Sequence, residues 1–319
     1  MANTVSSSNA LTPACPRDAS NGDASRGDAP RDVAQAELLV PAQAFALKFW
    51  GVRGNIPAPG ADTVRYGGNT ACVEVLAGNQ RLIFDGGTGL RVLGCHLLDQ
   101  GQPVNAHLFF THTHWDRIQG FPFFAPAFAP ETHLDIYGAP ALNGASIKQR
   151  LMEQMLRPNF FKPLQTMAAT MTFHNIAAGD SLTLGAVTVE PWSLNHHTSA
   201  LGYRVTWQNR VLVYATDTDP TQTSVDPNLL MLAAEADVLI FDGTYADAAY
   251  SDYSSPQQGQ PDPWHLGIEI AQASQVKHLV LFHHNPCHSD DQLDQLEHQV
   301  QASFANACLA REGMTLNLL

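Results

Sequence analysis

The feature that most constrains the fold is a series of short apolar runs that end in aspartate or histidine. Runs of this length, rich in Val, Ile, Leu and Phe, predict strands buried on both faces, as in an α/β protein. The polar residues at these ends are Asp85, His196 and His197, Asp217, Asp242, and His283 and His284. Aspartate favours turns for local reasons, so one such end would indicate little. Five of them predict that polar side chains converge where the strands end.

The apolar pattern also predicts the order of the elements. Strands are expected at 45–50, 71–76, 81–85, 107–111, 133–137, 186–191, 202–207, 211–217, 237–242 and 278–282. Helical spacing or N-capping residues predict helices within 141–156, from Asp226 and from Ser289. Two sets of strands, each followed by helices, predict two sheets packed face to face with helices outside, in one α/β domain over 44–319.

Composition narrows the class of protein. Of 319 residues, 17 are basic and 30 acidic, and the net charge of −13 disfavours extended contact with a nucleic-acid backbone. No apolar run reaches the roughly 18 residues of a membrane span. The five cysteines form no CxxC pair and predict free thiols, so we expect a soluble, cytoplasmic protein without a membrane partner. Residues 1–43 lack a sustained apolar period, and a disordered N-terminal leader is expected there.

The stretch HTHWD places His112, His114 and Asp116 at alternate positions directly after an apolar run. Alternate side chains of an extended or tightly turning segment point to the same side, so two imidazoles and a carboxylate can converge. These groups are ligands for zinc and its first-row neighbours. A polar loop whose histidines cap backbone groups is the alternative, and it stays open until further ligands are found.

The order Asp85, HTHWD, a solitary histidine, Asp217 and His283 resembles the metallo-β-lactamase superfamily. The resemblance extends over roughly residues 45–319 and is greatest to the branch of ribonuclease Z and the small phosphodiesterases. It is carried by FWGVRGNIPAPG, RYGGNTACVEV, LNHHTSALGYRV, YATDTD, FDGTY and LFHHNP. It implies a four-layer αββα sandwich, which agrees with the element order expected above.

The resemblance implies sites for one or two zinc ions, with manganese as an alternative. By position, the first metal would take His112, His114, His196 and Asp217, and the second would take Asp116, Asp217, His283 and residue 117. The family has histidine at position 117, whereas this chain has Arg117, whose guanidinium offers no lone pair. Three outcomes are open. The second site is weak or empty, or His284 completes it, or Arg117 takes the place of the second cation and contacts substrate phosphate.

Three further residues are candidates by the same resemblance. Asp85 would orient a ligand histidine rather than bind the metal. His265 lies near the position of a proton donor or phosphate contact, although Leu266 follows where the branch has Ser or Thr; a surface histidine that caps the nearby helix is the alternative. Asn69 lies in a loop that is close to the site in this branch, or it forms a structural turn.

The resemblance implies metal-assisted hydrolysis of a small phosphodiester, such as a cyclic nucleotide. Asp116 would orient or deprotonate the attacking water and His265 would assist the leaving oxygen. Three alternatives stay open: an RNA-processing nuclease of tRNA 3′ ends, a non-catalytic sensor with one metal that binds a phosphate ligand, and a thioesterase or lactamase. The expected partner is the small phosphodiester substrate, and we allow for a homodimer.

Overall fold

The computed structural model describes residues 44–194, 200–216, 218, 225–242 and 263–319. All of them belong to one compact unit, Val40–Leu319. The expected leader over 1–43 lies outside the described residues, as do His196, His197 and Asp217.

The first sheet has seven strands in the order β14-β1-β2-β3-β4-β5-β6. Their bounds are β1 Phe45–Gly51, β2 Cys72–Ala77, β3 Gln80–Phe84, β4 Asn105–Phe109, β5 His133–Gly138, β6 Thr170–Asn175 and β14 Thr315–Asn317. The strands from β14 to β3 pair antiparallel, and those from β3 to β6 pair parallel.

The second sheet also has seven strands, in the order β13-β12-β11-β10-β9-β8-β7. Their bounds are β7 Leu182–Leu184, β8 Val187–Ser193, β9 Leu201–Trp207, β10 Arg210–Ala215, β11 Val238–Asp242, β12 His278–Phe282 and β13 Ala307–Leu309. Pairing is antiparallel from β7 to β10 and parallel from β10 to β13. Each sheet therefore has one antiparallel part and one parallel part, although the two halves of the sequence show no repeat.

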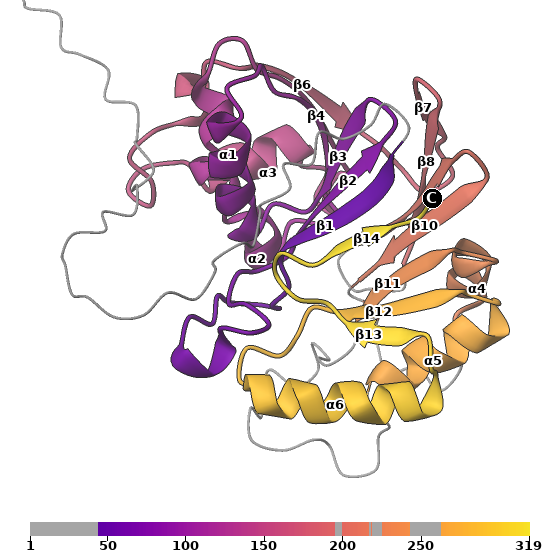
Figure 1. Ribbon diagram of the computed structural model, residues 1–319. Coiled ribbons are helices and arrows are strands. Elements are labelled where there is room, and N and C mark those ends of the chain that lie inside the picture. Colours follow the sequence, from indigo (N-terminus) through magenta and orange to yellow (C-terminus); the bar gives the residue numbers. More distant parts are fainter. Residues whose placement is uncertain (1–43, 195–199, 217, 219–224, 243–262) are drawn as a thin grey trace, which may run out of the picture. The chain divides into compact units, whose positions relative to one another are not determined.

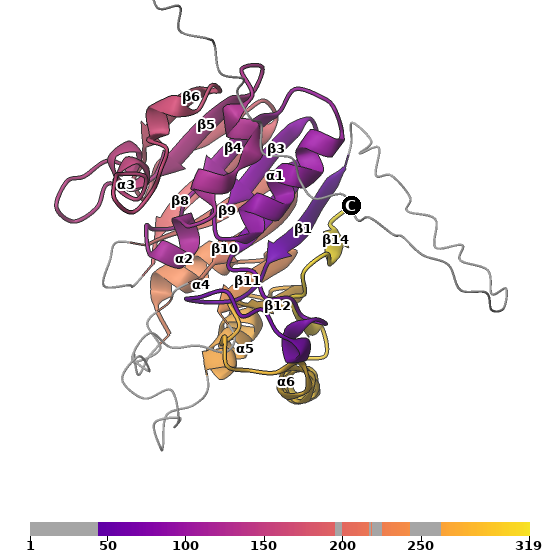
Figure 2. The same cartoon turned by 90° about the vertical axis from the view of Figure 1, so that its left-hand side faces the viewer.

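Helices cover the outer faces of both sheets. The α-helices are α1 Gly89–Asp99, α2 Trp115–Ile118, α3 Ile147–Glu153, α4 Pro227–Ala233, α5 Pro263–Ala273 and α6 Asp290–Ser303, and short 3-10 helices lie at Ala61–Thr63, Phe121–Phe123, Ala125–Phe128 and Leu164–Thr166. Figures 1 and 2 show α1 and α3 beside the first sheet and α4, α5 and α6 beside the second.

Three apolar cores hold these layers together. The central core lies between the sheets and takes residues such as Phe49 and Val75 from the first sheet and Val205 from the second. A second core packs the first sheet against α1 and α3, and a third packs the second sheet against α4, α5 and α6. Helix, sheet, sheet and helix therefore follow one another, and this confirms the expected αββα sandwich.

Two expectations need correction. The strand expected over 211–217 ends earlier in the described residues: β10 and its pairing with β11 end at Ala215, and Thr216 lies outside the strand. The cysteines are not all free thiols. Cys95 is disulfide-bonded, whereas Cys72, Cys287 and Cys308 are free. None of the helices in the described part of the chain combines the length and hydropathy needed to span a bilayer.

Candidate metal centre

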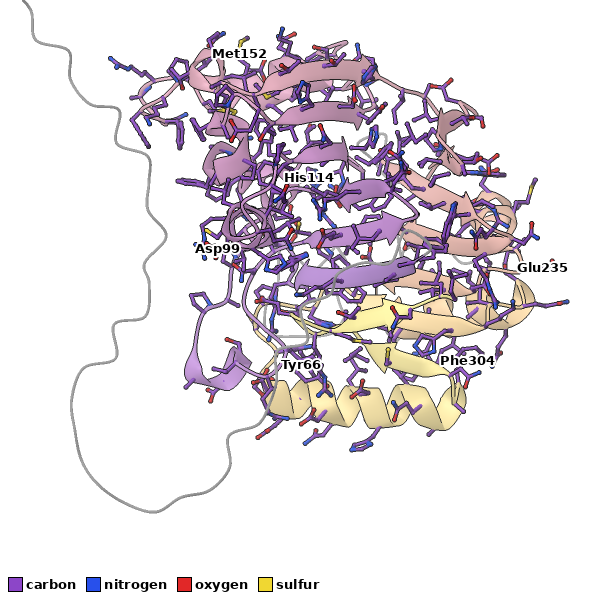
Figure 3. All side chains as sticks on the ribbon, turned by 45° about the horizontal axis from the view of Figure 1, so that its top comes forward. Tyr66, Asp99, His114, Met152, Glu235 and Phe304 are labelled. Atoms are coloured by element: carbon purple, nitrogen blue, oxygen red, sulfur yellow. The ribbon has the colours of Figure 1, made fainter. Side chains whose placement is uncertain are left out.

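The HTHWD stretch lies between the end of β4 and the first turn of α2. His114 is the N-cap residue of α2, with extended backbone, and Asp116 and Arg117 follow in the helix. Figure 3 shows His114 near the middle of the view, to the left of Glu235 and Phe304, which precede the parallel strands β11 and β13, and the motif follows the end of β4. The motif therefore lies toward the carboxyl ends of the strands, where the sequence predicted that polar residues converge.

Glycines allow the backbone of α2 to pack directly on the turn that follows β3. A Cβ at Gly120 would overlap the carbonyl oxygen of Gly87, and a Cβ at Gly87 would lie 2.5 Å from the carbonyl oxygen of Asp116. The amide of Gly86 also donates to the carbonyl of Arg117 at 2.6 Å. This close approach brings Asp85, at the mouth of the turn, next to the motif.

Asp85 fixes the orientation of His112 through Thr111. The Thr111 hydroxyl donates to the Asp85 carboxylate (3.0 Å to Oδ1) and lies 3.0 Å from Nδ1 of His112. A carboxylate only accepts hydrogen bonds, so the single hydroxyl proton points to Asp85 and the hydroxyl oxygen accepts from Nδ1–H. That arrangement places the lone pair of His112 on Nε2, the nitrogen that a metal ion needs.

The two motif histidines lie side by side. The ring centroids of His112 and His114 are 4.3 Å apart, and the rings are nearly perpendicular at 80°. The ring pair and the fixed tautomer fit the first metal site that the resemblance implies. Its remaining ligands, His196 and Asp217, lie outside the described residues, and within the described ranges no three His, Cys, Asp or Glu side chains form a metal-binding group on their own.

Asp116 contacts groups from two other segments of the chain. Its Oδ2 accepts a hydrogen bond from the Asn55 amide at 3.2 Å and lies 3.1 Å from Nε2 of His283. The other ring nitrogen of His283 lies 3.6 Å from Oδ1 of Asp242, at the end of β11. A Cβ at Gly54 would lie 2.8 Å from the His283 ring, so the loop after β1 packs on this histidine.

Arg117 is completely buried and contacts both acidic residues of the centre. Its Nη1 donates to Oδ2 of Asp85 at 3.0 Å and to the Tyr214 hydroxyl at 3.2 Å, and its Nε lies 3.4 Å from Oδ2 of Asp116. The Tyr214 hydroxyl in turn donates to Asp85 at 2.9 Å. The guanidinium thus joins Asp85 to Asp116.

A cavity of about 300 Å³ opens beside the two imidazoles. Its described wall includes His112, Thr113, His114 and the segment 139–143, and Arg150 of α3 supplies the cationic side chain. Arg150 donates to Glu153 at 2.9 Å and to Asn143 at 2.8 Å. Its Nε is buried and donates to none of the described residues. Arg150 therefore brings to this wall a positive charge that Glu153 partly offsets.

Three further sequence candidates have described contacts of their own. The Asn69 amide donates to Glu312 at 3.0 Å, and the Asn69 carbonyl accepts from Val52 and Arg53 at 2.9 Å each, as in a structural turn. His265 is exposed on α5 and stacks on Trp264. His284 lies 2.7 Å from the Ala310 carbonyl through Nε2, and burial lowers its pKa to about 3.

Sequence reasoning did not single out Thr111, Tyr214, Asn55 or Arg150. Asp242 was noted as a strand end but was not counted as a site residue. Tyr214 lies inside a continuous apolar strand, and Arg150 lies on a short helix, so neither stands out by spacing. Thr111 had the clearest signal, because it is the one polar residue between the buried end of β4 and His112.

Comparison with known families agrees with this geometry. A family model described as the beta-lactamase superfamily domain matches residues 80–284, which include Asp85, the HTHWD motif and His283. The chain belongs to the beta-lactamase superfamily. Most members of the superfamily are metal-dependent hydrolases.

Individual relatives within the superfamily match at lower identity. A ribonuclease Z from Crocosphaera subtropica is 31% identical over 109 residues, which cover 33% of this chain and 32% of the relative. The chain thus spans about a third of the length of this curated relative.

Among solved structures, the metallo-beta-lactamase fold protein YhfI from Bacillus subtilis matches with a TM-score of 0.62 and 17% identity, over 86% of this chain and 99% of that one. The short form of human tRNase Z matches with a TM-score of 0.58 and 18% identity, over the same shares. At such identities the likeness shows the fold alone, so this chain has the metallo-β-lactamase fold.

Proposed function

We propose that this protein is a metal-dependent hydrolase that acts on a small phosphodiester, such as a cyclic nucleotide. The observation that carries the proposal is the cavity that is lined by His112 and His114 of the HTHWD motif and by Arg150. A phosphate group in that cavity would lie near the proposed metal ligands and near a cationic residue. The volume of about 300 Å³ suits a small molecule.

In this proposal His112, His114, His196 and Asp217 hold a zinc ion, with manganese as the alternative metal. The ion would supply Lewis-acid activation of a water molecule and of a phosphoryl oxygen. Thr111 and Asp85 keep the proton of His112 on Nδ1, so that Nε2 stays available as a ligand.

The reaction is hydrolysis. The oxygen of water forms a bond to phosphorus, the ester P–O bond to the leaving group breaks, and the proton of the water passes to Asp116. The leaving oxygen takes up a proton, which His265 would supply by the resemblance. Arg150 binds a non-bridging phosphate oxygen and orients the substrate, since guanidinium and phosphate form strong, directional hydrogen bonds.

The decisive experiment measures metal content and hydrolysis together. Purified protein is expected to hold stoichiometric zinc or manganese and to hydrolyse bis-p-nitrophenyl phosphate. His114→Ala should lose metal and reduce hydrolysis at least about 100-fold, because a ligand is removed. His298→Ala, which changes an exposed histidine on α6, is the control and should leave both unchanged.

Two results would overturn the proposal: no stoichiometric metal in the wild type, or equal hydrolysis by His114→Ala. Bound metal without turnover on a panel of phosphodiester, thioester and lactam substrates would instead support the non-catalytic sensor. Turnover confined to thioesters or lactams would replace phosphodiesterase with one of those activities.

The role of Arg150 is tested by measuring KM and kcat separately. Arg150→Ala should raise KM for a phosphodiester about tenfold, the loss expected for one charge-assisted hydrogen bond, with a smaller effect on kcat. Lys148→Ala is the matched control, because it removes the same charge from the same helix, where Lys148 lies over the Phe173 ring. Equal KM values for the two variants would remove Arg150 from the substrate site.

A second candidate is an RNA-processing nuclease, which the ribonuclease Z relative favours. The net charge of −13 speaks against it, because RNA contacts depend on neutralising phosphates. Cleavage of a precursor tRNA at its 3′ end would support this candidate. Hydrolysis of small phosphodiesters without tRNA cleavage would support the first.

A further inference from the structure

Arg117 occupies the position at which the superfamily resemblance calls for a ligand of a second metal ion. Its side chain has no exposed surface, and the carboxylates that it joins, Asp85 and Asp116, are 2% and 5% exposed. Two buried carboxylates need compensating positive charge. The guanidinium supplies that charge by contacts of 3.0 Å to Asp85 and 3.4 Å to Asp116.

The same contacts work against a metal ion at Asp116. A divalent cation bound to this carboxylate would lie close to a buried guanidinium, and like charges repel strongly where water does not screen them. Arg117 cannot relieve the repulsion by losing its proton, because a guanidinium stays charged at any accessible pH. Asp85 and Tyr214 also hold Nη1 in place, at 3.0 and 3.2 Å.

We propose that Arg117 is a built-in cation that replaces the second metal ion, so that each chain binds one metal ion rather than two. The inference rests on the proposed function for the first metal site. It distinguishes among the three outcomes that the sequence leaves open. The second metal site is empty because a fixed positive charge takes its place.

The other two outcomes fit the structure less well. His284 packs on the Tyr66 ring and directs Nε2 to the Ala310 carbonyl, so it is held by groups away from Asp116. Arg117 lies below the surface, whereas Arg150 lies on the cavity wall. Arg117 therefore acts as a positioning residue for Asp85 and Asp116, and Arg150 is the arginine that meets the phosphate.

The test is the metal stoichiometry of the full chain, measured by equilibrium dialysis against zinc chloride and elemental analysis. Wild-type protein should bind one zinc ion per chain. Arg117→His should bind two, because the variant removes the positive charge and adds an imidazole beside Asp116 and His283. Arg117→Gln removes the charge without adding an imidazole and should bind a second zinc ion more weakly than Arg117→His does.

Arg210→His is the matched control. It makes the same substitution at a half-exposed arginine that pairs with Asp237, and it should bind one zinc ion. Thermal unfolding with and without zinc gives a second readout, since the added ion should raise the Tm of Arg117→His more than that of the wild type.

The outcomes separate the two proposals. Two zinc ions per wild-type chain would overturn this inference and leave the metal-dependent hydrolase standing. No zinc in the wild type would overturn the hydrolase proposal and the inference with it. If Arg117→His does not fold, the wild-type stoichiometry at saturating zinc still decides. A folded Arg117→His that binds only one zinc ion would also overturn the inference.

Discussion

At the scale of single residues, the centre depends on side chains that act through one another. Asp85 lies at a left-handed backbone position, with φ of 59°, and it reaches His112 through the Thr111 hydroxyl. Asp85 also accepts from Arg117 and Tyr214. The Asp85 carboxylate thus sets the tautomer of His112, a proposed metal ligand, and holds the Arg117 guanidinium beside Asp116.

Thr111→Val tests this link with little change in side-chain shape. The variant should raise the dissociation constant for zinc about 10- to 100-fold, because Nδ1 of His112 loses the hydroxyl that fixes its tautomer. It should also lower the free energy of unfolding by about 1–3 kcal/mol, because buried polar groups lose a partner. Competition with a chromophoric chelator measures the first effect and urea unfolding the second.

Thr111→Ser retains the hydroxyl and should bind zinc like the wild type. Equal zinc affinity of Thr111→Val and the wild type would exclude a role of the Thr111 hydroxyl in orienting His112.

Cysteine reactivity gives a second prediction for single residues. Burial raises the pKa of Cys308 to about 12 and raises that of Cys72 well above its usual range, whereas Cys287 is exposed. Since the thiolate is the reactive form, iodoacetamide at pH 8 should label Cys287 before Cys72 and Cys308. Cys72 and Cys308 should react only after unfolding, as read by peptide mass spectrometry. Labelling of Cys308 in the folded protein at the rate of Cys287 would contradict the burial of β13.

At the scale of elements, hydrogen bonds near the start of α6 hold the loops on either side of the candidate metal centre. Asp290 accepts hydrogen bonds from the backbone amides of Arg65 and Tyr66, at 2.7 and 3.1 Å. Arg53 donates to the carbonyls of Asn285 and His288, at 3.0 and 2.8 Å. These contacts hold the loop after β1 against the segment that follows His283.

The N-terminus of α6 carries a capping box formed by Ser289 and Gln292. Ser289→Ala should lower the free energy of unfolding by about 0.5–2 kcal/mol, the usual loss for an N-cap. Ser303→Ala at the other end of the helix is the control and should change it by less than about 0.5 kcal/mol. Urea unfolding of the two variants makes the comparison. A Ser289→Ala variant as stable as the wild type would show that the tertiary contacts of Asp290 hold the helix end by themselves.

The sequence predicted elements where the apolar pattern is continuous, and it failed where other forces decide. β11 and β12 were expected almost as they are, because both are buried runs bounded by polar residues. α1 was missed, since glycines interrupt its pattern and Thr88 gives no side-chain cap. The edge strand β6 is partly exposed along its length and forms because β5 offers a pairing edge.

The same limit applies to the candidate site. The positions of His112, His114 and Asp116 follow from local spacing. The partners of Arg117 do not, because Tyr214 is 97 residues away in the sequence and only the packing of the two sheets brings its hydroxyl to Asp85. The polar residues at the strand ends predicted where the site forms. The packing of the two sheets determines which other side chains belong to it.

At the scale of the whole molecule, the last strand closes the first sheet. β14 pairs antiparallel with β1, from Ala46 opposite Asn317 to Lys48 opposite Thr315. Leu318 is buried in the central core, and Leu316 packs against it. The end of the chain therefore completes both the sheet and the core between the sheets.

Removal of residues 315–319 should destabilise the domain. The deletion exposes an edge of β1 and removes two leucines from the core, so the free energy of unfolding should fall by about 2–5 kcal/mol. Deletion of Leu319 alone is the control, because this residue is 54% exposed and should matter by less than about 0.5 kcal/mol. Urea unfolding compares the two, and equal stability would mean that β14 adds nothing to the sheet.

The pairing of β14 with β1 also sets an order of events during synthesis. β1 leaves the ribosome early, but its second neighbour is made only after almost all of the domain has been translated. Until then one edge of β1 has free backbone N–H and C=O groups and can pair with a strand of another nascent chain. The register of β1 and β14 can therefore form only after the other strands of the first sheet have been translated.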